Sequence, residues 1–186
     1  MHFLQKISNM SLETITKVVD DFEERIFLKN EFFLREGKIC DHLYLIEGVM
    51  RAYTTDFDGN EVTTNIFLPG RAAYDPASFF LQTRSMENIQ AITDCLAYSI
   101  SFEKVNKLFH ALPEFRDYGR LTLVKELVSY KQRTLTMVIR SAEERYEDLI
   151  KNNEDIFQFV QLKHIASYLG VTNSSLSRIR REYSRH

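Results

Sequence analysis

Residues 161–183 carry the feature that most constrains the fold, because their pattern fits two short helices that meet at a steep angle. Such a pair needs a small residue where the helices touch, here Ala166, and a turn residue that tolerates a left-handed backbone, here Gly170. Thr172 is placed to cap the second helix. Apolar side chains are expected to close the wedge between the helices: Ile165, Leu169, Val171, Leu176 and Ile179. The second helix is also expected to bury Tyr183. The pattern predicts a helix-turn-helix, and an αα-hairpin without a DNA role is the alternative.

The predicted outer face of the second helix is polar and basic. Side chains of this kind reach base edges and phosphates in a major groove. Arg178, one turn into the helix, is the candidate for a bidentate contact with guanine, and Asn173 and Ser174 are the next candidates for base contact. Ser177 and Arg181 on the same face, and Thr172 at the start of the helix, are further DNA-binding candidates. The side chains expected to contact phosphates are Lys163, Arg180, Arg181 and Arg185.

Charge is distributed unevenly along the chain. Residues 161–186 contain five cations and one acid, Glu182, so they carry a net charge of +4, which leaves −6 for the first 160 residues of a chain whose net charge is −2. An acidic body with a basic tail indicates that only the tail meets a polyanion. A solvated surface helix is the alternative that charge alone leaves open.

Four glycines organise the first half of the chain. Gly37, Gly48, Gly59 and Gly70 are separated by equal intervals of eleven residues. Turn signals at this spacing, between runs rich in Tyr, Leu, Ile and Val, are typical of short antiparallel strands in a sandwich or small barrel. The runs at 42–46, 49–54, 62–68 and 89–100 are the expected strands, with a hairpin turn at 58–59 or 59–60.

Helices are expected around this β-domain. Ser11 is a plausible cap for a short helix with Leu12, Ile15, Val19, Phe22 and Ile26 on one side, and Ser101 for a second helix. Pro113 opens a long helix that ends near Ile139. A capping box at residues 141–144 predicts a new helix towards Lys151, and residues 152–154 resemble a hinge into the last module.

The long helix carries two apolar stripes. The first is Leu121, Val124, Val128, Leu135 and Val138, and the second is Leu123, Leu127, Tyr130 and Met137. A helix with two such faces must bury both, so we expect one to pack on its own β-domain and the other on a second copy of the chain, as in a coiled-coil dimer. A helix sandwiched inside one domain is the alternative.

Composition excludes several classes of protein. With 44% hydrophobic and 27% charged residues, the chain can bury a core and is not expected to be disordered. Its two cysteines, Cys40 and Cys95, are too few for a disulfide scaffold or a four-thiolate cluster. The start shows no signal peptide and no apolar stretch approaches the length of a membrane span, so a soluble, cytoplasmic protein without a membrane partner is expected.

This architecture resembles the Crp–Fnr family of bacterial transcription regulators, and most closely its short members from Bacteroidetes. The matching segments are 35–37, 44–51, 67–70, 141–146 and 176–180. The resemblance implies an α+β fold with an N-terminal antiparallel β-roll (jelly-roll or cupin-like) at 1–112, a dimerisation helix at 113–140 and a helix-turn-helix domain at 141–186. It also implies a homodimer that reads a near-palindromic operator in double-stranded DNA, a possible small-molecule effector, and RNA polymerase as a further candidate partner.

The sequence departs from the family pattern in the segment that corresponds to the phosphate cassette. Members that bind cyclic AMP have Gly-Glu at the start of this cassette and Arg-Ser or Arg-Thr near its end. Residues 73–88 contain no Gly-Glu, the Arg84-Ser85 pair falls about one place early, and Glu87 would set an anion beside the phosphate. Cyclic AMP is therefore not the expected ligand. The candidates for lining a pocket for another ligand are Arg71, Tyr74, Arg84, Ser85 and Tyr130. The β-hairpin wing that usually follows the family's second helix is not expected within residues 184–186.

Two alternatives remain open from the sequence. One is a ligand-free regulator, whose β-domain only dimerises or binds partner proteins. The other is a cupin-like enzyme, which needs a metal held by clustered His and Glu. The five histidines, at positions 2, 42, 110, 164 and 186, are scattered, and neither a phosphate loop nor a nucleophile elbow is present. We therefore expect no catalytic residues, no metal and no cofactor.

Overall fold

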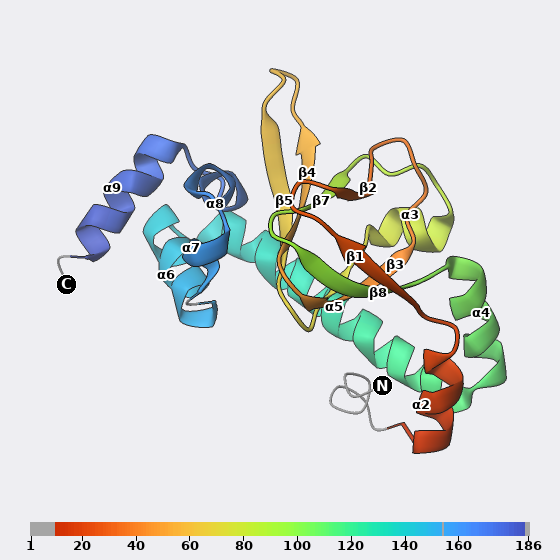
Figure 1. The fold of residues 1–186 in the computed structure, drawn as a ribbon. Helices are drawn as coiled ribbons and strands as arrows, with labels where there is room; N and C mark the ends of the chain where they lie inside the picture. Colours follow the sequence, from red (N-terminus) through yellow and green to blue (C-terminus); the bar gives the residue numbers. More distant parts are fainter. Residues whose placement is uncertain (1–9, 154, 185–186) are drawn as a thin grey trace.

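A computed structural model of the chain describes residues 10–153 and 155–184 (Figure 1). Its first half contains two four-stranded antiparallel sheets, with strand orders β1-β8-β3-β6 and β2-β7-β4-β5. The strands are β1 (Glu23–Phe27), β2 (Phe32–Leu34), β3 (His42–Glu47), β4 (Met50–Thr55), β5 (Glu61–Phe67), β6 (Ala72–Ala73), β7 (Asn88–Ala91) and β8 (Cys95–Ile100). The predicted α+β fold with an antiparallel β-roll is confirmed.

The four evenly spaced glycines are turn residues, as predicted. Their φ angles lie between +80° and +86°, in the left-handed region that side chains other than hydrogen disfavour. The predicted hairpin joins β4 to β5 through residues 56–60. There the Asp56 carboxylate accepts hydrogen bonds from the amides of Asp58 and Asn60 at 3.0 and 2.8 Å, and these bonds fix the turn.

The prediction of one strand over residues 89–100 is wrong. β7 and β8 belong to different sheets and are separated by a corner at residues 92–94. Two polar side chains hold this corner: Thr93 Oγ1 accepts from the Val49 amide at 2.9 Å, and Asp94 accepts from the Lys29 amide at 2.8 Å. The corner carries the chain from one sheet to the other.

Serine caps begin three of the helices as predicted: α2 (Leu12–Val19), α4 (Phe102–Ala111) and α6 (Ala142–Asn152). The first of these helices is shorter than its apolar pattern indicated. Phe22 lies beyond its end, and Ile26 belongs to β1, where its side chain is exposed. A helix absent from the predictions, α3 (Pro76–Leu81), follows β6.

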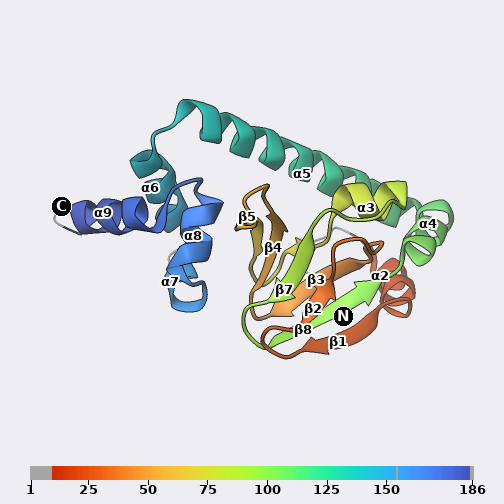
Figure 2. The same cartoon turned by 90° about the horizontal axis from the view of Figure 1, so that it is seen from above.

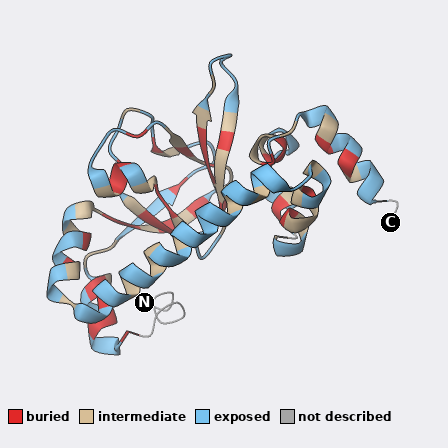
Figure 3. Cartoon of the chain, turned by 180° about the vertical axis from the view of Figure 1, so that it is seen from behind, coloured by how far each residue is buried: buried red, intermediate tan, exposed pale blue. Residues whose placement is uncertain are grey.

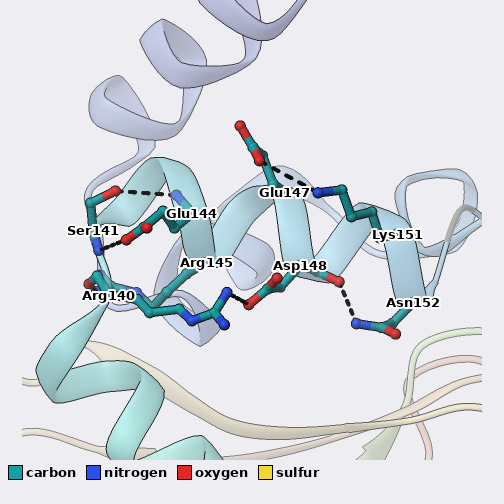
Figure 4. A network of polar contacts seen from close by, with 8 residues as sticks. All are labelled: Arg140, Ser141, Glu144, Arg145, Glu147, Asp148, Lys151 and Asn152. Atoms are coloured by element: carbon teal, nitrogen blue, oxygen red, sulfur yellow. Dashed lines mark hydrogen bonds and ion pairs between the residues drawn. The ribbon is translucent and has the colours of Figure 1, made fainter.

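A sharp corner at residues 140–141 separates α5 (Pro113–Ile139) from α6 (Figure 4). The predicted capping box is present, with the Ser141 hydroxyl accepting from the Glu144 amide and the Glu144 carboxylate accepting from the Ser141 amide. Arg140 donates to Asp148 at 2.6 Å, and Arg145 donates to the Arg140 carbonyl at 2.7 Å. The start of α6 is thus fixed against the end of α5. The predicted hinge covers residues 152–154. Residue 152 is the last residue of α6, residue 153 is its C-cap, and residue 154 lies outside the described residues.

The prediction that one apolar stripe of α5 packs on its own β-roll is wrong, and so is the alternative of a helix enclosed within one domain. Within α5 only Phe115 is buried. The side chains on the half-buried face are mostly polar, including Tyr118, Thr122, Glu126 and Arg133, because this face borders a cavity instead of a close-packed core. Seen from behind, the helix is largely exposed along its length (Figure 3). The predicted stripe residues Leu121, Val124, Leu127, Val128, Tyr130, Leu135, Met137 and Val138 are all exposed.

The remaining helices form a second unit: α6, α7 (Ile156–Phe159), α8 (Leu162–Tyr168) and α9 (Asn173–Tyr183). The apolar cluster of this unit is distinct from the one inside the β-roll, although it also takes in Val49 of the β-roll. The predicted boundaries at 112/113 and 140/141 coincide with the start of α5 and the corner after it, and they remain a prediction about which parts fold as units. No helix within the described part of the chain has the length and apolar character needed to cross a membrane.

Candidate nucleic-acid interface

The two helices predicted for residues 161–183 are α8 and α9. Gly170 adopts φ +67° in the turn between them, and the Thr172 hydroxyl caps α9 by accepting from the Ser175 amide at 3.2 Å. The two helices bury apolar side chains against each other: Ile165, Ala166 and Leu169 from α8 and its C-cap, and Leu176 and Ile179 from α9. Val171 packs against this cluster. The local geometry of the helix-turn-helix is therefore as predicted.

The prediction that the second helix buries Tyr183 is wrong. Tyr183 is exposed, and its ring lies 5.5 Å from that of Tyr146 on α6. Because α9 extends a turn beyond the contact with α8, its last aromatic side chain packs at the edge of α6 and not in the wedge.

The outer face of α9 is open to solvent. Asn173, Ser174, Ser177, Arg178 and Arg181 are all exposed. Within the described ranges, the side chains of Asn173, Arg178 and Arg181 form no hydrogen bond or salt bridge, although the charge of Arg178 contributes to lowering the pKa of Glu143 on α6. Polar and cationic side chains left unpaired on one helix face can donate to base edges and phosphates without first breaking contacts within the protein.

The other DNA-binding candidates differ in how far their side chains are already engaged. Thr172 uses its hydroxyl for the cap, and Ser177 donates to the Asn173 carbonyl at 2.9 Å. Arg180 is half-buried, with its guanidinium 5.3 Å from the centre of the Phe157 ring, so part of its role is to hold α7. Lys163 is exposed on α8, and residue 185 lies outside the described residues.

A cavity of about 1020 Å³ lies between the β-roll and α5, with polar and aromatic residues on its wall. Among the predicted ligand candidates, Arg71, Tyr74 and Tyr130 line it, whereas Arg84 and Ser85 do not. Arg84 is exposed, and Ser85 is buried beside the cavity. His42 and Glu126, which the sequence did not single out, are also on the wall.

Acidic and basic side chains both line this cavity, and its acids include Glu126. The Tyr74 hydroxyl donates to Glu126, and burial raises the pKa of that carboxyl above its usual range although the hydrogen bond opposes the shift. Burial, followed by the charges of Glu126, Glu87 and Asp75, raises the pKa of Tyr130 to about 12. The wall next to α5 therefore offers a carboxyl and phenol hydroxyls for hydrogen bonds to a ligand, with Lys125 and Arg133 on the same helix.

The segment that corresponds to the phosphate cassette is occupied by a carboxylate of the chain itself. Asp75 caps α3, where one oxygen accepts from the amides of Ala77 and Ser78 at 3.0 and 3.3 Å. Its other oxygen accepts from the Ser85 hydroxyl at 2.7 Å. The amides of Ala77 and Ser78 and the hydroxyl of Ser85 are therefore already paired within the chain. The sequence contained the signal for this cap, Asp followed by Pro at the first helical position.

No group of His, Cys, Asp and Glu within the described residues has a metal-binding arrangement. Cys40 and Cys95 are buried and free, and burial raises the pKa of the Cys40 thiol to about 12. This thiol donates to the Asp41 carbonyl at 2.9 Å and accepts from the Asp75 amide at 3.3 Å, so it is a buried structural group.

Comparison with known proteins agrees with this architecture. Residues 24–111 match the cyclic nucleotide-binding domain family. The transcriptional activator protein Anr of Pseudomonas protegens is 24% identical over 167 residues, which cover 81% of this chain and 66% of that protein, just under two thirds of its length.

Solved structures show the same fold. FixK2 of Bradyrhizobium japonicum superposes with a TM-score of 0.74 at 17% identity, covering 88% of this chain and 85% of that one. The c-di-GMP-responsive global regulator CLP of Xanthomonas campestris gives 0.71 at 15% identity, covering 94% and 92%. In its cyclic nucleotide-binding domain match, long helix and helix-turn-helix, the chain is similar to transcription regulators of the Crp–Fnr type.

Proposed function

We propose that the protein is a homodimeric regulator that binds a near-palindromic DNA site through α9. The observation that carries this proposal is the open face of α9, where Asn173, Arg178 and Arg181 are exposed and unpaired among the described residues. Two-fold symmetry of the dimer would be mirrored in an operator whose half-sites lie about one helical turn apart. A regulator that acts on DNA in this way works in the cytoplasm.

A selection from random duplex oligonucleotides tests the proposal. We expect a palindromic consensus from the purified protein, and its half-site spacing gives the distance between the two copies of α9. Enrichment that depends on added cell extract would indicate that the β-roll senses a small molecule. No enrichment with or without extract would contradict DNA reading by α9.

Arg178→Ala and Lys163→Ala are expected to affect binding differently. Loss of a bidentate guanine contact should cost about 1–3 kcal/mol and relax specificity at one base position. Loss of the Lys163 phosphate contact should weaken binding to all sequences and lower the slope of log affinity against log salt by about 1. Competition binding against single-base operator variants, at several salt concentrations, separates the two effects. An Arg178→Ala protein that binds the selected operator as tightly as wild type would refute the base-reading role.

Dimerisation through α5 is supported by the apolar side chains that α5 leaves exposed. Leu123, Val124 and Leu127 line a second, shallower depression together with Phe109 of α4, so the apolar surface continues onto the neighbouring helix. Exposed apolar surface of this extent on a single chain is typical of an interface. A second copy of the same helix is the occupant we propose, because two-fold pairing buries the same stripe on both chains.

We propose that cyclic AMP is not the effector, because Asp75 already occupies the amides at the start of α3. An incoming phosphate would have to displace this carboxylate or lie beside it, with Glu87 close by. The cavity wall of Tyr74, Glu126 and Tyr130 supports an effector of another class over a β-roll without any ligand. Calorimetric titration with cyclic AMP should show no binding at micromolar concentrations, and a micromolar dissociation constant would overturn this assignment.

A further inference from the structure

The helix-turn-helix is docked on the β-roll of its own chain. In Figures 1 and 2, α8 lies next to β5, the edge strand of the sheet β2-β7-β4-β5. An edge strand presents unpaired amides and carbonyls. Here Ser167 of α8 serves both kinds of group: its hydroxyl accepts from the Thr63 amide at 2.8 Å and donates to the Glu61 carbonyl at 3.4 Å.

A buried arginine joins the two units beside this edge. Arg51 of β4 is only 3% exposed. Its guanidinium contacts Glu61 of β5 at 2.6 Å and Nδ1 of His164 on α8 at 2.5 Å, and it lies 4.1 Å from the centre of the Tyr53 ring. A buried charge is stable only when its donors are paired, so His164 completes a set of partners that the β-roll alone does not supply.

His164 is suited to this contact in its neutral form. Burial, followed by the charge of Arg51, lowers the pKa of His164 to about 4. The neutral ring accepts at Nδ1, whereas a protonated ring would present a second donor to the guanidinium. The contact is therefore fully formed at neutral pH.

Two further contacts hold the same helix. The apolar cluster of the helix-turn-helix includes the buried Val49 of the β-roll, with Ile66, Leu68 and Ile92 packed around it. On the other side, Arg133 of α5 donates to the Tyr168 carbonyl at 3.2 Å, and its guanidinium lies 3.8 Å from the centre of the Tyr168 ring. Helix α8 is thus fixed to both the β-roll and α5.

We infer that Arg51 is a positioning residue for DNA binding, which through His164 holds α9 in the orientation that lets two copies engage both half-sites together. This inference rests on the proposed function. Helix α9 packs on α8 through Leu176 and Ile179, so it moves with α8, and its reading face stays exposed in the docked arrangement. When the orientation is fixed, the helix-turn-helix of the second copy is already placed once the first copy has bound its half-site. Binding the second half-site then carries no further entropic cost of ordering that helix-turn-helix.

Two substitutions at the same position provide the test. His164→Leu removes the acceptor and leaves one side of Arg51 unpaired, whereas His164→Asn keeps an oxygen close to the place of Nδ1. For the full-length leucine variant we expect about tenfold or greater loss of affinity for the selected palindrome, with affinity for a duplex carrying one half-site unchanged. The asparagine variant should retain most of the palindrome affinity. A role limited to stability would lower both affinities together.

Hydrogen exchange at the Thr63 amide reports the docking without DNA. This amide should be protected in wild type and exchange faster in His164→Leu and in Ser167→Ala. The alanine variant removes the hydroxyl that bonds both Thr63 and Glu61, and it keeps the protein testable if the leucine variant does not fold. An unprotected Thr63 in wild type, or faster exchange with unchanged or increased palindrome affinity, would overturn the inference. If wild type does not prefer a palindrome, the proposed function fails instead, and Thr63 protection still reports whether the contact exists.

Discussion

Replacing Val124 and Val128 together with glutamate is expected to convert the dimer into a folded monomer. Both side chains lie on the exposed stripe of α5, 51% and 49% exposed in a single chain, so the substitutions remove little packing from the protomer itself. In the proposed dimer the same positions meet their copies, and four carboxylates would be buried without partners. The contact between the two chains should be lost.

The consequence for DNA binding is large because the two half-sites would then be bound independently. Linking two binding modules raises affinity by about 10²–10⁴, and separating them removes this gain. We therefore expect at least a hundredfold loss of affinity for the palindrome, with half-site affinity retained. Analytical ultracentrifugation gives the oligomeric state, and competition binding gives the two affinities.

Lys107→Glu is the matched control for this experiment. It changes the net charge by the same two units, at an exposed position on α4 outside the stripe. This variant should stay dimeric and bind the palindrome like wild type. A double glutamate variant that remains dimeric would show that the chains associate through another surface.

The parts of the fold that were predictable from sequence are those fixed by local backbone constraints. A left-handed turn or a helix start accepts few residue types, so each can be recognised from a few neighbouring residues. Examples are the turns at Gly48 and Gly170 and the caps at Ser141 and Thr172. The helix-turn-helix and the β-turns were predicted for this reason. The Asp75 cap of α3 had the same kind of signature.

Features that depend on residues distant in sequence were not predictable in the same way. The contact between Arg51 and His164 spans 113 positions, and neither residue stands out locally. Apolar periodicity also gave the wrong partner for α5. Hydrophobic spacing indicates that a helix face is apolar, but it does not identify the surface that covers the face, and here the β-roll side of α5 is lined by Tyr118, Thr122 and Glu126.

Gly48→Ala is expected to destabilise the β-roll more than an equivalent change at the other glycine turns. Gly48 has φ +86°, and a Cβ added there would lie 2.2 Å from the Asp94 carbonyl oxygen and 2.6 Å from the Cys95 sulfur. The oxygen belongs to the corner between β7 and β8, which the bond between Thr93 and Val49 holds in place. The obstacle is therefore backbone that cannot rotate away.

Gly59→Ala separates the two causes of this cost. Gly59 has nearly the same φ, +84°, but a Cβ added there meets nothing within 4 Å. Its substitution should cost only the left-handed backbone, roughly 1–2 kcal/mol in the free energy of unfolding. Gly48→Ala adds an overpacking cost of about 1–3 kcal/mol, so the total should be about 2–5 kcal/mol. Urea unfolding followed by circular dichroism measures both. Equal losses at the two positions would show that the corner at residues 92–94 yields to the added methyl group and that only the φ angle requires glycine at Gly48.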